Sequence, residues 1–349
     1  MSSDKTVSSN GAEGYNVFGI SSSIAATLIL ISPILFTLVA YPDTFILSWN
    51  EGRGGFLFAM AFIAAELVGL KYSLTKKRLL LVAGMAALTI SYFIALPYGL
   101  SDYIRNGKDV YNVSLVDSWM WLWDFVVMAV FVASSLVLLF GKKWYKIASA
   151  GAIYLAGSAL ILALDAFFPF DSLGPLQIVV PIYLQIDQAI INFVDTFIIN
   201  VGPQTPNSSA EPALATGNLL VMNGLHGPFA LQVFWPSAGV HSMIIYTLVM
   251  LAMLIKMDMP LTRKLIYFAA GTLGTVATNL VRIVSLSLYA LVVTTDVQEW
   301  EAFHSIAGEI MFLPWLGIYL GVVIYIENKR IRRLQAGLTS GAASNPSTL

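Results

Sequence analysis

Long apolar runs are the feature that most constrains this chain. A helix needs about 20 apolar residues to cross the hydrocarbon core of a bilayer, and inside lipid its backbone groups must be hydrogen-bonded within the segment. The sequence therefore predicts an all-α polytopic membrane protein with about eight transmembrane helices. The expected spans are residues 18–41, 54–71, 79–98, 118–140, 147–168, 238–256, 265–293 and 305–326.

The composition agrees with lipid as the main solvent. Of 349 residues, 57% are hydrophobic and 11% are charged, whereas soluble domains carry roughly 25% charged residues. The net charge of -1 leaves no basic excess for binding nucleic acid. The absence of cysteine excludes disulfides, thiolate metal sites and a cysteine nucleophile. Because the three histidines are scattered, we expect neither a metal nor a cofactor.

Basic residues set the expected orientation, because cytoplasmic loops are enriched in Lys and Arg. Basic clusters follow the second, fourth, sixth and eighth predicted spans. We therefore expect these clusters and both termini in the cytoplasm. The segments expected outside, which carry acids and few bases, are residues 42–53, 99–117, 169–237 and 294–303.

One further apolar stretch, residues 176–200, would break this alternation if it crossed the membrane. Its polar residues are spaced three or four apart and form one stripe on a helix. We therefore expect an extracytoplasmic amphipathic helix that lies on the membrane or caps the bundle; a ninth span facing a polar cavity is the alternative. The stripe consists of Gln185, Gln188, Asn192 and Asp195.

A short β-hairpin is expected between this helix and the sixth span. Residues 219–222 and 229–235 are two β-like runs separated by glycine-containing turn sequences. For the whole chain we expect a disordered tail at residues 1–15, one transmembrane domain at 16–333, and a disordered tail at 334–349.

Charged groups inside a membrane are costly and therefore often mark function. Arg282 is the strongest such signal, and its position in the seventh span places it in the outer half of the bundle. The alternative is a structural arginine paired with Asp124 or Glu309. Asp124 is expected either as the counter-ion of a buried arginine or as a partner of tryptophan indoles.

Ser237 and His304 share the expected leaflet of Arg282. Ser237 stands where the hairpin meets the sixth span, near helix N-terminal amides that can stabilise an oxyanion; an ordinary N-cap serine is the alternative. His304 begins the last span and is the expected general base, with His241 as a rival. Together Ser237, Arg282 and His304 fit a nucleophile, charge stabiliser and base.

Three segments resemble the exosortase/archaeosortase family of membrane transpeptidases over about residues 150–326. They are Ser237-Ala238-Gly239, Asn279-Leu280-Val281-Arg282-Ile283 and His304-Ser305-Ile306-Ala307-Gly308. The family normally has cysteine where Ser237 stands. The combination looks most like the thaumarchaeosortase branch, in which serine occupies this position; an inactive form with serine replacing cysteine is the competing explanation.

The resemblance implies an archaeal enzyme of the cell membrane that anchors exported proteins at the cell surface. Its substrates would carry a short motif of the Pro-Glu-Phe-Gly type, a hydrophobic helix and a basic tail. Cleavage would form an acyl-enzyme outside the membrane and transfer it to an amine, expected on a lipid. Ser237, Arg282 and His304 would be catalytic, with His241, Asn279, Glu309 and Asp124 as supporting candidates.

Two other readings remain open from the sequence. A hydrolytic membrane serine protease would use the same residues but release a free carboxylate. A transporter or structural membrane protein would use Arg282 only in a buried pair with an acid.

Overall fold

The computed structural model describes residues 16–17, 20–46, 52–68, 70, 72, 74–169, 178–199 and 212–343. The predicted tail at residues 1–15 lies outside them. The chain divides into two units, which are described separately. The first takes in the described residues up to Phe167 together with Ala252–Met257; the second takes in Phe168–Leu251 and the residues from Asp258 onward.

Seven helices are long and apolar enough to cross a membrane, among the described residues. The predicted class of all-α polytopic membrane protein is therefore confirmed, but the count of eight spans is not. The helix in the second predicted span, α2 (Gly55–Leu67), has 13 residues. It ends where Val68 becomes extended, just before Gly69, and glycine is favoured beyond a helix end.

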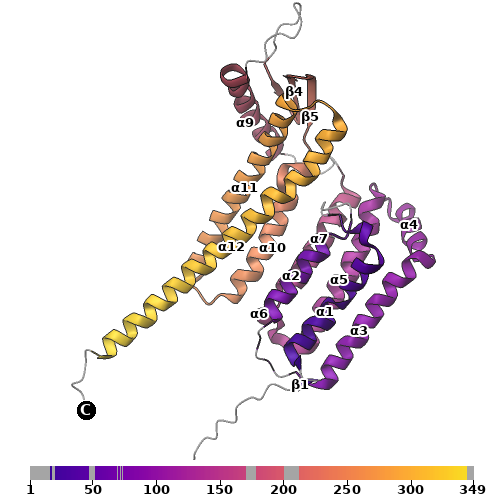
Figure 1. Cartoon of the computed structure of the whole chain (residues 1–349), viewed down its shortest axis with the longest axis vertical. Helices are drawn as coiled ribbons and strands as arrows, with labels where there is room; N and C mark the ends of the chain where they lie inside the picture. Colours follow the sequence, from indigo (N-terminus) through magenta and orange to yellow (C-terminus); the bar gives the residue numbers. More distant parts are fainter. Residues whose placement is uncertain are drawn as a thin grey trace, which may run out of the picture. The chain divides into compact units, whose positions relative to one another are not determined.

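The first unit is a helical bundle (Figure 1). Aromatic side chains pack in its interior. The ring of Phe56 on α2 lies 4.7 Å from that of Phe125 and 6.2 Å from that of Phe93. All three side chains are almost fully buried. The other main helices of this unit are α1 (Ser22–Ala40), α3 (Lys76–Ala95), α5 (Val116–Phe140), the short α6 (Trp144–Ile147) and α7 (Ala150–Phe167).

An additional helix, α4 (Leu100–Tyr111), occupies the segment that was expected to be a plain external loop. Leu100, Tyr103, Ile104 and Gly107, which line one side of a pocket, recur at helical spacing. That periodicity was present in the sequence and could have predicted the helix.

The second unit contains α11 (Leu261–Val292), the 47-residue α12 (Val297–Ala343) and part of α10. The α10 helix runs over His241–Lys256, and its residues up to Leu251 belong to this unit. The α12 helix continues past residue 333, where a disordered tail was expected to begin. Residues 329–336 are mostly Lys, Arg, Leu, Gln and Ala, which favour helix.

A small sheet and α9 (Val179–Val194) gather at one end of α11 (Figure 1). The predicted hairpin is present as β4 (Leu219–Gly224) and β5 (Gly227–Gln232), with Met222 opposite Phe229. A third strand, β3 (Leu214–Thr216), pairs antiparallel with β4. At 16 residues α9 is not among the helices of spanning length, as expected.

The polar stripe of α9 holds this sheet. The Asn192 side chain accepts a hydrogen bond from the backbone N of Ala213 at 2.8 Å and donates one to the carbonyl oxygen of Ala213. Gln188 accepts from the backbone N of Ala215 at 3.0 Å. Part of the predicted stripe therefore faces the edge strand β3 instead of solvent.

Candidate functional site

The backbone after the hairpin makes a tight turn at Pro236–Val240 before α10 begins. Gly239 in this turn has a φ of +91°, a conformation that L side chains rarely adopt. A Cβ on Gly239 would overlap the side-chain amide of Asn279. The Asn279 amide donates to the Gly239 carbonyl oxygen at 3.2 Å, so Asn279 on α11 fixes the turn that presents Ser237.

Arg282, one turn after Asn279, contacts the same turn. Its Nη2 donates to the backbone carbonyl oxygen of Ser237 at 3.1 Å. Its Nε is fully buried, and no described group accepts a hydrogen bond from it. A buried charged donor without an acceptor is costly and calls for an explanation. The guanidinium thus has one donor engaged by Ser237 and another unused.

The third segment reaches the same guanidinium from α12. A Cβ on Gly308 would lie 3.3 Å from Nη1 of Arg282, so this glycine leaves room for the arginine. His304 lies one turn earlier on α12. The three segments singled out in the sequence therefore meet around Arg282, all within the second unit.

His304 is held by two neighbours on its own helix. Its Nδ1 lies 3.5 Å from a carboxylate oxygen of Glu301, and its ring stacks on Trp300 with centroids 5.1 Å apart. Trp300 is buried and donates from Nε1 to the carbonyl oxygen of Leu286 on α11. Glu301 was not singled out in the sequence, although its position three residues before His304 was a usable signal.

His241 was the rival candidate for the base. It is the first residue of α10 and is buried, with its ring edge-on to Trp235 at 5.3 Å. Trp235 is itself fully buried and donates to the carbonyl oxygen of Phe168 at 3.1 Å. His241 therefore has little access to a substrate, unlike the half-buried Ser237, Arg282 and His304.

Asp124 belongs to a different cluster, in the first unit. Both Nε and Nη2 of Arg53 lie 2.8 Å from Oδ2 of Asp124, and the Tyr92 hydroxyl donates to Oδ1 at 2.9 Å. The guanidinium also lies over the rings of Tyr41 and Trp121. Asp124 is thus the counter-ion of a buried arginine, as one reading expected, but that arginine is Arg53 rather than Arg282.

Arg282 has no carboxylate partner among the described residues. The side chain of Glu309, the other acid considered for it, lies outside them, although its backbone belongs to α12. In the same described part of the chain, no three His, Asp or Glu side chains gather to hold a metal ion.

One buried acid near the site was missed in the sequence. Asp187 on α9 is fully buried and accepts a hydrogen bond from the Ser287 hydroxyl on α11 at 2.5 Å. Its other oxygen has no partner among the described residues. Burial raises the pKa of Asp187 from 3.8 to about 6, and the Ser287 hydrogen bond opposes this rise.

The arrangement is a half-buried serine on a turn that requires glycine at position 239, an arginine with an unused donor, and a histidine beside a carboxylate. These are residue types that activate a hydroxyl and stabilise a negative charge. In the described part of the chain, no hydrogen bond joins the Ser237 hydroxyl to His304. Comparison with known proteins adds nothing to this geometry: no family model, no curated protein and no solved structure matches the chain.

Proposed function

We propose that this protein is a membrane-embedded processing enzyme that cleaves C-terminal sorting signals of exported proteins and transfers the product to an amine. The observation that carries the proposal is the meeting of three separate segments at Arg282. Its Nη2 bonds to Ser237, its Nη1 lies against Gly308, and the preceding turn of its helix places Asn279 on Gly239. These are the residues on which the resemblance to exosortases and archaeosortases rests.

The proposed reaction begins with attack of the Ser237 hydroxyl oxygen on the scissile carbonyl carbon. His304 takes the hydroxyl proton, and the carbonyl oxygen gains the negative charge. The positive charge of the Arg282 guanidinium stabilises that oxyanion, an effect worth roughly 10²–10³ in rate by comparison with known oxyanion-hole donors. Collapse breaks the peptide C–N bond, and His304 returns the proton to the leaving amine. The product is an acyl ester on Ser237.

The second half of the reaction reverses these steps with a new nucleophile. An amine, which we propose belongs to a membrane lipid, attacks the ester carbon and gives up its proton to His304. The C–O bond to Ser237 then breaks, and the serine recovers its proton. Water in place of the amine gives simple hydrolysis.

The neighbours of His304 support its role as the base. A serine hydroxyl is a weak nucleophile unless a base removes its proton. The Glu301 carboxylate beside Nδ1 can hold the imidazole so that Nε2 is free to accept that proton. Stacking on the buried Trp300 restricts rotation of the ring. We therefore assign Glu301 and Trp300 as positioning residues.

We further propose that the site opens on the extracytoplasmic side of the cell membrane. Support comes from the basic clusters of the sequence, which favour cytoplasmic loops at the opposite ends of the helices. The proposal places both termini in the cytoplasm, which requires an even number of crossings. The α2 segment must therefore supply an eighth crossing in addition to the seven long helices. The partners are exported proteins with a C-terminal transmembrane helix and a basic tail, and a lipid acceptor.

The test is processing of a reporter protein that carries such a C-terminal signal, co-expressed with the enzyme. Wild type should remove the C-terminal helix, and the Ser237→Ala, Arg282→Ala and His304→Ala variants should leave it in place. Mass spectrometry of the new C-terminus separates transfer, which adds a lipid, from hydrolysis, which leaves a carboxylate. Normal processing by Ser237→Ala would contradict the proposal.

A cysteine variant addresses the competing explanation of an inactive serine form. If serine is the working nucleophile, Ser237→Cys should have activity comparable to or below that of wild type. If wild type is inactive and Ser237→Cys alone processes the reporter, the serine stands in for a lost cysteine.

A further inference from the structure

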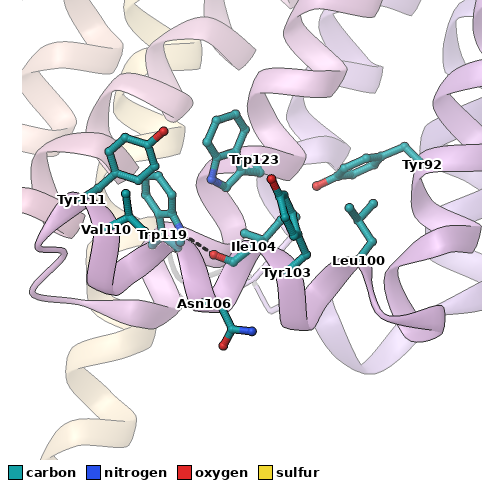
Figure 2. A pocket seen from close by; sticks show the side chains of 10 residues that line it. Tyr92, Leu100, Tyr103, Ile104, Asn106, Val110, Tyr111, Trp119 and Trp123 are labelled. Carbon is teal, nitrogen blue, oxygen red and sulfur yellow. Dashed lines mark hydrogen bonds between the residues drawn. The ribbon is translucent and has the colours of Figure 1, made fainter.

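The first unit contains a cavity of about 540 Å³ that the proposed reaction does not use (Figure 2). It lies between α4 and the spanning helices α3 and α5. Five aromatic side chains surround it: Tyr92, Tyr103, Tyr111, Trp119 and Trp123. Its volume is within the range of about 300–1,000 Å³ found for small-molecule sites.

The inner wall of this cavity offers few free polar groups. The Tyr92 hydroxyl is used by Asp124 at 2.9 Å. The Trp119 indole donates to the carbonyl oxygen of Ile104 at 2.8 Å, the bond dashed in Figure 2. The Asn106 amide points away from the rings in the same view. Tyr103, Tyr111 and Trp123 each add one polar group to the lining, but most of their ring surface is apolar. A ligand in this cavity would therefore be held mainly through apolar contacts.

The α4 helix beside the cavity has the features of a helix at a membrane interface. At 12 residues α4 is too short to span a bilayer, whereas its neighbours α3 and α5 are long enough. Its exposed residues Asp102, Arg105 and Asp109 form a polar face opposite the cavity. An amphipathic helix of this kind lies where headgroups meet acyl chains, a level at which Trp and Tyr are enriched.

The rim is accessible and carries no net charge. The side chains of Tyr103 and Tyr111 are 79% and 61% exposed. The two acids of α4 are balanced by Arg105 and Lys108, so the helix has no excess of positive charge for an anionic headgroup. The features of the site therefore match a hydrocarbon chain rather than a particular headgroup.

We propose that this cavity binds the hydrocarbon chain of a membrane lipid, with the headgroup remaining at the interface beside α4. The inference is independent of the proposed function, because every residue it uses belongs to the first unit and none belongs to the Ser237 site. It predicts a saturable lipid site on α4 and α5, distinct from the general lipid contact of spanning helices.

The test uses the full-length protein in lipid nanodiscs that contain a phosphatidylcholine with a photoactivatable diazirine in its acyl chain. After irradiation, labelled peptides are identified by mass spectrometry. We expect saturable labelling of residues 98–123 at low probe fraction. The same probe with a phosphatidylglycerol headgroup should label equally. Labelling spread over all spans without saturation, or about tenfold stronger labelling by the anionic probe, would overturn the proposal.

Two glycines provide a matched pair of variants. A Cβ on Gly107 would lie 3.6 Å from the Trp119 ring, at the cavity wall, whereas Gly84 on α3 has no neighbour within 4 Å. Gly107→Leu should reduce labelling about tenfold by filling the cavity, and Gly84→Leu should leave it unchanged. If Gly107→Leu does not fold, Val110→Trp fills the cavity from its exposed rim. Wild-type labelling in a folded cavity-filling variant would contradict the inference.

Discussion

Arg282 donates a hydrogen bond from Nη2 to the backbone carbonyl oxygen of Ser237 at 3.1 Å. This contact joins α11 to the turn before α10, and it leaves the buried Nε without an acceptor among the described residues. The guanidinium thus has two tasks in our account. Its Nη2 holds the backbone of the nucleophile, and its positive charge stabilises the developing oxyanion.

Replacement of Arg282 should therefore lower the rate of processing rather than abolish folding. We expect Arg282→Ala to slow reporter processing by roughly 10²–10³, the effect of removing one oxyanion donor. Arg282→Lys keeps the charge but has one nitrogen in place of a planar fork, so it should recover only part of the rate. A time course of reporter cleavage measures both. The exposed Arg105→Ala is the control and should process like wild type.

Gly239 is the position at which the turn is least tolerant of substitution. Gly239→Ala should destabilise the protein by about 1–3 kcal/mol through its positive φ alone, and the overlap with the Asn279 amide adds to this. Thermal unfolding in detergent, followed by tryptophan fluorescence, gives the comparison. Gly317→Ala on α12, where a Cβ meets nothing within 4 Å, should be neutral or stabilising by up to about 1 kcal/mol. Equal stability of the two variants would show that the turn does not require glycine at position 239.

The Arg53–Asp124 pair should matter for stability and not for chemistry. Both side chains are buried, with exposed fractions of 5% and 2% for the two residues. Removing one partner leaves a buried charge, so Asp124→Ala should lose about 3–5 kcal/mol. The triple variant Arg53→Met, Asp124→Leu, Tyr92→Phe removes these three polar side chains together and should be more stable than Asp124→Ala. The Thr44 hydroxyl, which accepts a hydrogen bond from Arg53, still donates to the Tyr41 carbonyl oxygen. A triple variant that folds but no longer processes the reporter would restore Asp124 as a catalytic candidate.

Asp187 should make the stability depend on pH. Its pKa in the folded protein is raised from 3.8 to about 6, so the folded state binds the proton more tightly than the unfolded state. Protonated Asp187 therefore contributes about 3 kcal/mol to the free energy of unfolding below about pH 4. This contribution is lost as the pH rises to about 6. Unfolding temperatures measured from pH 4 to 8 test this.

The Asp187→Asn variant is the control for that pH dependence. Its amide oxygen can still accept the Ser287 hydrogen bond, and it carries no charge at any pH. The variant should lose the fall in stability between pH 4 and 6 and be at least as stable as wild type at pH 7. The same fall in both proteins would assign the pH dependence to another group.

Much of the fold followed from the sequence, because lipid imposes simple rules on it. The long apolar helices, the non-spanning α9 and the hairpin were all predicted from run length, stripe spacing and glycine turns. The α4 helix was missed because its 12 residues lie in a segment read only for charge. The strand β3 was missed because three residues carry no pattern of their own; it is held by Gln188 and Asn192 of α9.

The sequence predicted that Ser237, Arg282 and His304 share one leaflet, which stays a prediction, but it did not predict the partners of these residues. Arg53 was read as part of an external loop, and only the tertiary fold brings it 2.8 Å from Asp124. Asp187 was overlooked because it lies among apolar residues of α9, off the polar stripe. A pairing between residues 71 or 100 positions apart depends on packing between helices, and neither spacing nor composition encodes it.

The most direct test of the central claim is covalent labelling of the nucleophile. The purified protein in detergent is treated with a fluorophosphonate, which reacts with activated serine hydroxyls, and the adduct is located by peptide mass spectrometry. The account predicts one adduct, on Ser237, that is lost in Ser237→Ala and strongly reduced in His304→Ala and Arg282→Ala. An unlabelled Ser237 in a protein that still processes its reporter would contradict it.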